Sequence, residues 1–168
     1  MSAAAAQRRA LLTHPAGWIV SGLGSGFNPV APGTAGSLAA LLPWFALREL
    51  PPAGYALAVV LAFALGVWAC NWAVGVLRLQ DPSVAVWDEF VGLWIALAPL
   101  LLHAAGWVWI CAGFILFRLF DIAKPWPVSW ADRRVGGGFG VMLDDVLAGV
   151  YAALVLELLL VLGRRAVG

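Results

Sequence analysis

Five long apolar runs, separated by short polar or glycine- and proline-rich segments, dominate the hydrophobic pattern of the chain. They cover residues 37–50, 54–79, 88–102, 106–120 and 141–162. No run shows the ten-residue alternation of a membrane barrel strand, and backbone in lipid must satisfy its own hydrogen bonds, so we expect helices throughout. At about 1.5 Å of rise per residue, only the second and fifth runs can cross a bilayer core unaided. We expect the other three to be short, tilted or partly re-entrant.

Small residues and prolines inside these runs indicate how the helices pack. Gly66, Ala69 and Ala73 recur at helical spacing in the second run, which lets a neighbouring helix approach closely. Pro43 and Pro99 are expected to kink the first and third runs. We therefore expect an all-α fold, a compact polytopic membrane helical bundle of about five to six helices, some of them short or re-entrant.

The composition favours a membrane protein and argues against other classes. Of the 168 residues, 63% are hydrophobic and 11% are charged, and the mean hydropathy is +0.93, far outside the soluble globular range. This length fits a single domain, residues 1–168. The N-terminal stretch lacks the apolar core of a signal peptide, so we expect it to be retained. No basic stripe interleaved with aromatic residues is present, so we expect no nucleic-acid partner.

Charged residues gather on one side of the bundle if the five runs alternate across the membrane. Segments 1–36, 80–88 and 121–140 then share one face with the adjoining helix ends, and this face carries seven of the ten basic residues. By the positive-inside rule, that face is cytoplasmic. The same face collects seven of the nine acidic residues: Asp81, Asp88, Glu89, Asp121, Asp132, Asp144 and Asp145. We therefore expect the chemistry to lie at one end of the bundle.

Two acidic pairs, Asp88–Glu89 and Asp144–Asp145, stand at the expected starts of the third and fifth helices. One acid at each start is explained by the helix dipole. The second acid must face a neighbouring helix, where a carboxylate needs a cation or a basic partner. With no His or Cys nearby, these carboxylates favour a hard cation such as Mg²⁺ over zinc. Helix-end charges or salt bridges are the alternative.

The segment 117–134 mixes charged residues with tryptophans: Arg118, Asp121, Lys124, Asp132, Arg133 and Arg134 with Trp126 and Trp130. It could be an interface anchor, with its tryptophans at headgroup depth and Arg118 paired with Asp121 one turn later. It could equally hold an anionic lipid headgroup, because basic residues beside a metal suit a phosphate.

The glycine-rich segment GSGFNPVAPGTAGS, residues 24–37, leads into the first apolar run. Its glycines and the following helix N-terminus could form a phosphate cradle, although the spacing and lysine of a P-loop are absent. Alternatively, the segment is a turn in which Thr34 or Ser37 caps the first helix.

Four blocks, in this order, resemble the phosphatidylglycerophosphatase A family. They are GLGSGFNPVAPGTAGSLAA, VWDEFVGLWIAL, FRLFDIAKPWPVSWADR and GGGFGVMLDDVLAGV, and the resemblance covers roughly residues 17–153. It implies an all-helical bundle in which one helix is surrounded by the others. It also implies a Mg²⁺-dependent lipid phosphatase of the bacterial inner membrane, which converts the phospholipid phosphatidylglycerophosphate into phosphatidylglycerol.

The resemblance also implies site residues. Asp88, Glu89, Asp144 and Asp145 match the acidic pairs of the family, Asp121 and Lys124 match its D-x-x-K-P-W-P block, and Ser25, Thr34 and Ser37 match its hydroxyl loop. We expect the acidic pairs to bind Mg²⁺ and, with Asp121 and Lys124, to be catalytic. The expected substrate-binding residues are Gly24, Ser25, Gly33, Thr34, Ser37 and Arg133.

Two questions stay open at this point. The phosphate could be attacked by water, or by Asp145 or Asp121 through an aspartyl-phosphate intermediate. The alternative function is a small membrane transporter or ion-coupled carrier, which would also need broken helices and acidic residues. It is disfavoured because a carrier places its site near the midplane of the bilayer.

Overall fold

The computed structural model describes residues 3–79, 82–103 and 106–167, and within them the chain is all-helical. The α-helices are α1 (Ala3–Thr13), α2 (Pro15–Val20), α3 (Pro32–Leu47), α4 (Pro52–Leu77), α5 (Trp87–Leu97), α6 (Trp107–Ala123), α7 (Val128–Arg134) and α8 (Gly137–Val167). Two short 3₁₀ segments lie between α-helices: η1 (Ser25–Phe27) between α2 and α3, and η2 (Ala98–Leu101) between α5 and α6. The all-α prediction is confirmed.

The five apolar runs correspond to α3, α4, α5, α6 and α8. Pro99 ends the third of these helices where we expected a kink: α5 stops at Leu97 and the chain continues as η2, because proline lacks the amide that the α-helix needs. Pro43 lies inside α3. The hydrophobic pattern does not predict α1, α2 or α7, which contain no long apolar run.

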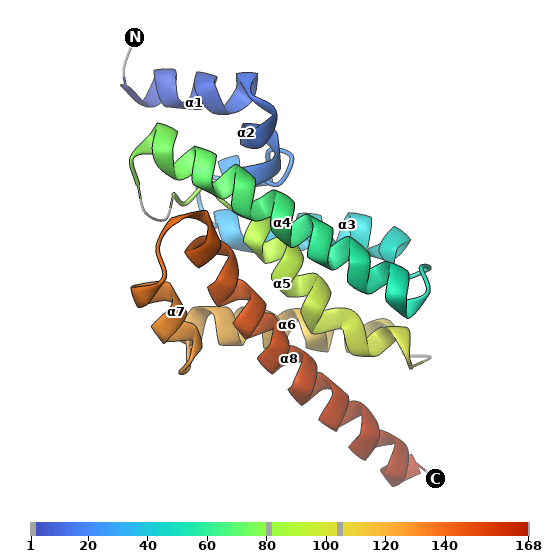
Figure 1. Ribbon diagram of the computed structural model, residues 1–168. Coiled ribbons are helices and arrows are strands. Elements are labelled where there is room, and N and C mark those ends of the chain that lie inside the picture. The colour runs from blue at the N-terminus through green and yellow to red at the C-terminus, as the bar shows by residue number, and fades with distance from the viewer. Residues whose placement is uncertain (1–2, 80–81, 104–105, 168) are drawn as a thin grey trace.

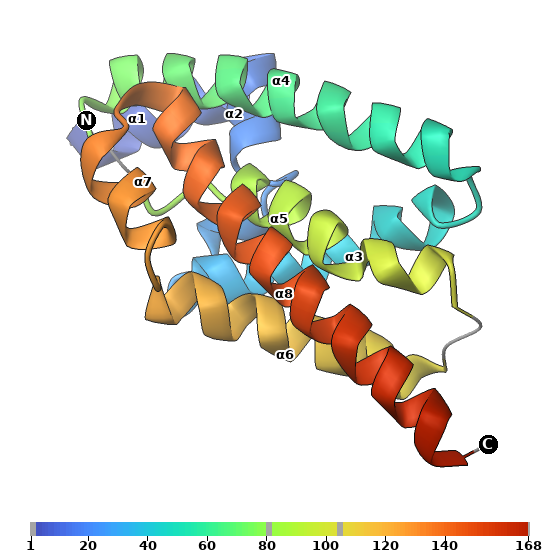
Figure 2. The same cartoon turned by 60° about the horizontal axis from the view of Figure 1, so that its bottom comes forward.

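Helix α5 lies at the centre of the bundle. It packs against α3, α4, α6 and α8, and the two views in Figure 1 and Figure 2 show it enclosed among them. Nine of its eleven residues are buried. Its crossing with α8 is close, since a Cβ on Gly149 would overlap the carbonyl oxygen of Gly92, and small residues permit such an approach. The surrounded helix that the family resemblance implies is therefore present.

One end of the bundle gathers the starts of α3, α5 and α8 with the ends of α4 and α6. The Gly138 amide at the start of α8 donates to Asn71 Oδ1 near the end of α4 (2.7 Å), and the other three ends meet around one cavity. At the opposite end, the Tyr55 hydroxyl of α4 donates to the Trp94 carbonyl of α5 (2.6 Å). The five helices run in alternating directions along the bundle, as alternation of the runs across a membrane requires. Asp81 lies outside the described residues.

Two helices are long and apolar enough to cross a membrane, α4 and the stretch Gly137–Arg165 of α8. They contain the two runs that the sequence predicts to be long enough. Their outer faces carry exposed leucines, among them Leu57 and Leu61 on α4 and Leu154 and Leu158 on α8. Exposed apolar faces on helices of this length are typical of a membrane protein.

Candidate active site

An acidic cavity of about 540 Å³ lies at the end of the bundle where these helix ends meet. Its walls come from the starts of α3, α5 and α8, the end of α6, and α7 with the residues that follow it. Six acidic side chains line the acidic cavity: Asp88, Glu89, Asp121, Asp132, Asp144 and Asp145. Three basic side chains also line it: Lys124, Arg133 and Arg134. The fold thus brings both acidic pairs together with Asp121, Lys124 and Arg133.

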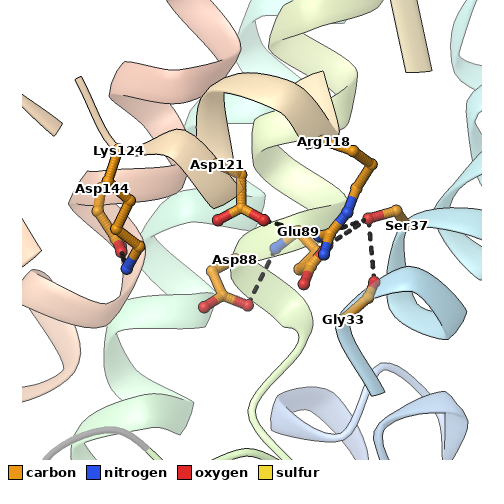
Figure 3. Close-up of polar contacts among 8 residues, drawn as sticks. All are labelled: Gly33, Ser37, Asp88, Glu89, Arg118, Asp121, Lys124 and Asp144. Carbon is orange, nitrogen blue, oxygen red and sulfur yellow. Dashed lines mark hydrogen bonds and ion pairs between the residues drawn. The ribbon is translucent and has the colours of Figure 1, made fainter. Parts of the chain in front are cut away.

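The first acidic pair stands in the first turn of α5, as the sequence predicts. Asp88 and Glu89 are 9% and 8% exposed, and the Asp88 carboxylate accepts a hydrogen bond from the Glu89 amide (2.9 Å). The Ser37 hydroxyl of α3 donates to the Glu89 carboxylate and lies 3.0 Å from the Gly33 carbonyl oxygen (Figure 3). A Cβ on Gly33 would overlap Glu89 Oε1, so any larger residue here would force the carboxylate or α3 to move.

Arg118 of α6 joins these groups to Asp121. Its Nη1 forms ion pairs with the Glu89 carboxylate and with Asp121 Oδ2 (2.8 Å), and it donates to Ser37 Oγ (3.3 Å). Only 16% of the Arg118 side chain is exposed, and the two carboxylates offset the cost of burying its charge. The predicted Arg118–Asp121 pair is present, but the sequence pattern does not predict the link to Glu89. The sequence feature that could have indicated this link is the position of Arg118 inside an apolar run, where a charged residue needs a partner.

Lys124 ends α6 in the left-handed conformation (φ 43°). Its ammonium group pairs with Asp132 of α7 (2.5 Å) and with Asp144 of α8 (2.8 Å). Burial alone would lower the pKa of Lys124, but the hydrogen bonds and charges of the two carboxylates outweigh it and raise the pKa above its ordinary value of 10.5. Lys124 therefore keeps its positive charge at neutral pH.

The second acidic pair does not stand at a helix start, contrary to the sequence prediction. Helix α8 begins at Gly137, so Asp144 and Asp145 lie about two turns inside it. The helix can begin this early because Gly138 carries no Cβ, which would overlap the backbone of α4. The helix dipole therefore does not account for this pair. Asp145 is 4% exposed, and within the described residues its carboxylate forms no hydrogen bond or ion pair.

The acidic cavity holds a surplus of negative charge. Six carboxylates face three basic side chains that line the cavity and the guanidinium of Arg118 behind them. Among the described residues, no three His, Cys, Asp or Glu side chains are close enough to hold a metal ion as they stand; Glu89 is drawn to Arg118 and Asp144 to Lys124. A buried carboxylate such as Asp145 needs a cationic partner. The surplus charge and the oxygen-only donors fit a hard divalent cation.

The first part of the glycine-rich segment does not line the acidic cavity. Gly24 and Ser25 are not among the described residues that line it. Both belong to the turn around η1, where the Ser25 hydroxyl donates to the Gly22 carbonyl oxygen (2.9 Å). Their assignment to substrate binding stays a prediction from the family resemblance.

The second part of the segment reaches the acidic cavity through the start of α3. Gly33 lines the cavity, whereas Ser37 contacts Glu89 from behind it. Thr34 is not among the described lining residues, and neither hydroxyl caps α3, whose N-cap is Ala31. The preceding turn is instead closed by Asn28 Oδ1, which accepts a hydrogen bond from the Ala31 amide (3.1 Å).

Different side chains of the segment 117–134 have the positions that the two predicted roles would need. Lys124 and Arg133 line the acidic cavity, as a headgroup-binding role requires. Trp126 and Trp130 are 76% and 50% exposed, as an interface anchor requires. The two interpretations therefore describe different side chains of the same segment.

The fold and the site together define a class: an all-helical bundle protein with a carboxylate-rich cavity at one end, bordered by basic groups that suit an anionic substrate. Sequence comparison gives the family within this class. The model of the family described as phosphatidylglycerophosphatase A matches residues 18–160. The chain belongs to this family, and it is an enzyme, a phosphoric monoester hydrolase.

Three individual relatives match this chain over most of their length. The chain is 43% identical over 148 residues to phosphatidylglycerophosphatase A of Escherichia coli (88% of this chain and 85% of the relative). It is 41% identical over 145 residues to the Haemophilus influenzae protein of the same name (86% and 88%). A Bacteroides thetaiotaomicron protein with the provisional name phosphatidylinositol-3-phosphatase is 45% identical over 145 residues (80% and 86%). No solved structure matches the chain.

Proposed function

We propose that the chain removes the terminal phosphate of phosphatidylglycerophosphate in a Mg²⁺-dependent reaction, giving phosphatidylglycerol and phosphate. The observation that carries this proposal is the acidic cavity, in which buried carboxylates outnumber the basic groups beside them. A divalent cation would balance the carboxylates, while Lys124 and Arg133 suit a phosphate. The names of the family and of the Escherichia coli and Haemophilus influenzae relatives support this substrate.

The cation would be held by the two acidic pairs, Asp88 and Glu89 on α5 and Asp144 and Asp145 on α8. When bound, Mg²⁺ polarises a phosphate and lowers the pKa of a water molecule that can attack it. The acidic pairs suit this role because they are buried on two helices that pack closely together. A site built on rigid helices holds its oxygen ligands in place.

The phosphate would be held by Lys124 and Arg133. An ammonium group has three N–H donors, and two of those of Lys124 are used by Asp132 and Asp144. The third donor is available to a non-bridging phosphate oxygen, and the two carboxylates fix the ammonium group in place for that contact. A positive charge fixed in this way stabilises negative charge that develops in the transition state. Gly33 lines the cavity at the start of α3, so its backbone would border the bound phosphate.

The enzyme would act in the bacterial inner membrane as a multi-pass protein, with the acidic cavity on the cytoplasmic side. The basic residues gathered at the cavity end of the bundle support this orientation through the positive-inside rule. The exposed Trp126 and Trp130 would lie at headgroup depth, close to residues that line the cavity. The lipid bilayer would then present the substrate headgroup directly to the site.

A substrate panel tests the proposal. Purified protein in detergent micelles with Mg²⁺ is given phosphatidylglycerophosphate, phosphatidylinositol 3-phosphate or phosphatidic acid, and phosphate release is measured. We expect the highest kcat/KM with phosphatidylglycerophosphate. Faster hydrolysis of phosphatidylinositol 3-phosphate, the substrate that the name of the Bacteroides relative indicates, would overturn the substrate assignment. A single turnover in oxygen-18 water, analysed by mass, would separate direct water attack from an aspartyl-phosphate intermediate.

A further inference from the structure

We infer that Arg118 is a positioning residue of the cation site, which acts through Glu89 and Asp121 and does not touch the substrate. The inference rests on the proposed Mg²⁺-dependent function. Nothing in the sequence pattern assigns Arg118 more than a pairing with Asp121 at the membrane interface. The contacts of its guanidinium point to a different role.

Arg118 gathers groups from three helices around a single nitrogen. Its Nη1 contacts the Glu89 carboxylate of α5, Asp121 Oδ2 of its own helix α6, and Ser37 Oγ of α3. Figure 3 shows the guanidinium directed toward Glu89 and Ser37. Arg118 is not among the described residues that line the acidic cavity, although Glu89 and Asp121 are. The guanidinium therefore lies behind these two carboxylates, where a substrate phosphate would not meet it.

These contacts leave the Glu89 carboxylate with one orientation. Its Oε2 is taken by Ser37 and Arg118, and its Oε1 lies against Gly33 at the wall of the acidic cavity. Asp121 is tied to the same guanidinium through Oδ2. Partners behind the ligands of a metal set their orientation, and loss of such a partner typically weakens metal binding by about 10- to 100-fold.

The charge of Arg118 and its positioning role predict opposite effects on cation binding. Removing a positive charge close to a cation site would by itself strengthen cation binding, because one repulsive interaction is lost. Losing the fixed orientation of Glu89 and Asp121 would weaken it. The sign of the change in an Arg118 variant therefore separates the two effects.

The experiment measures Mn²⁺ binding by electron paramagnetic resonance in purified wild type, Arg118→Gln and Arg118→Lys. We expect Arg118→Gln to bind Mn²⁺ at least about tenfold more weakly than wild type. The Mn²⁺ affinity of Arg118→Lys should lie between those of wild type and Arg118→Gln, because lysine keeps the charge but has a shorter, unbranched end. The control is Arg164→Gln, which removes an exposed arginine at the other end of α8 and should bind as wild type does. Equal or tighter Mn²⁺ binding by Arg118→Gln would overturn the inference.

A double variant guards against an Arg118 variant that simply fails to fold. Glu89→Gln with Arg118→Gln removes both charges of the buried pair, so neither is left without a partner. If Arg118 acts partly through Glu89, the double variant loses less Mn²⁺ affinity than the sum of the losses in Glu89→Gln and Arg118→Gln. Additive losses would contradict the inference.

The outcome for Arg118 is distinguishable from the outcome for the proposed substrate. A wild type that binds Mn²⁺ but does not hydrolyse phosphatidylglycerophosphate would overturn the substrate assignment and leave the role of Arg118 standing. A raised KM for phosphatidylglycerophosphate in Arg118→Gln, with unchanged Mn²⁺ affinity, would show that Arg118 binds substrate and would overturn the positioning role. A wild type that binds no Mn²⁺ would overturn the cation site and the positioning role together.

Discussion

Replacement of Gly33 by alanine tests the closest contact in the wall of the acidic cavity. A Cβ at this position would overlap Glu89 Oε1 and lie 3.2 Å from Arg118 Nη2. The Glu89 carboxylate cannot simply move aside, because Ser37 and Arg118 hold its other oxygen. Gly33→Ala must therefore either pull the carboxylate from its partners or push α3 away from α5.

The cost of either response can be bounded. A hydrogen bond to a charged group contributes about 1.5–3 kcal/mol, and an extra methyl group in a packed site costs about 1–3 kcal/mol. We expect Gly33→Ala to destabilise the packing and hydrogen bonding of the site by about 2 kcal/mol. If that loss falls on the transition state, kcat/KM drops by about 30-fold, since about 1.4 kcal/mol corresponds to tenfold.

The assay is phosphate release from phosphatidylglycerophosphate, with thermal unfolding of the same samples. Gly75→Ala is the matched control, because a Cβ on Gly75 of α4 would meet nothing within 4 Å and alanine favours a helix by about 0.5–1 kcal/mol over glycine. Gly75→Ala should keep its activity and unfold no earlier than wild type. If Gly33→Ala behaves like this control, the inferred contact between α3 and Glu89 is wrong.

Three further predictions test other parts of the site. Asp88→Asn should lower Mg²⁺-dependent turnover by more than tenfold, about 1.4 kcal/mol of barrier, with unchanged circular dichroism; a smaller loss would remove Asp88 from the cation site. The raised pKa of Lys124 means that its ion pairs contribute stability below about pH 10 and lose it only as the pH rises through the folded-state pKa. Lys124→Met should therefore unfold at a lower temperature than wild type by a constant margin between pH 6 and 9; a margin that changes across this range would contradict that pKa. Ser83→Cys, in a variant without the native cysteines, should resist an impermeant thiol reagent in intact cells; labelling from outside would reverse the proposed orientation.

The cysteine experiment uses Ser83 for a structural reason. Ser83 is exposed and lines the acidic cavity, so a cysteine there reports the side of the membrane that the cavity faces. Gly137 also lines the cavity, but its φ of +71° would strain any other residue.

The arrangement of the helices agrees with the hydrophobic pattern, because each long apolar run forms a helix and successive long helices run in opposite directions. That reversal is enough to bring Asp88, Asp121 and Asp144 to one end of the bundle, where they line one cavity. The hydrophobic pattern does not predict the short helix α7, because α7 has no long apolar run and packs against α8.

The details of the site depend on contacts between helices, which the local pattern does not encode. The glycines from Gly136 to Gly138 look like a loop, yet close packing on α4 lets α8 begin at Gly137, which moves Asp144 and Asp145 into the helix interior. The link from Arg118 to Glu89 and Ser37 joins residues from three separate runs. Spacing along one helix predicts only the Arg118–Asp121 pair.

The most direct test of the central claim is phosphate release from phosphatidylglycerophosphate as Mg²⁺ is titrated and then removed with EDTA, in wild type and in Asp145→Asn. Asp145 is the most buried acid of the cavity. Glu157→Gln is the matched control, since Glu157 pairs with His103 (2.8 Å) at the opposite end of the bundle. We predict that wild type and Glu157→Gln release phosphate only with Mg²⁺, and that Asp145→Asn loses at least about tenfold of that activity. Release that persists in EDTA, or an Asp145→Asn variant as active as Glu157→Gln, would contradict a cation-dependent reaction in the acidic cavity.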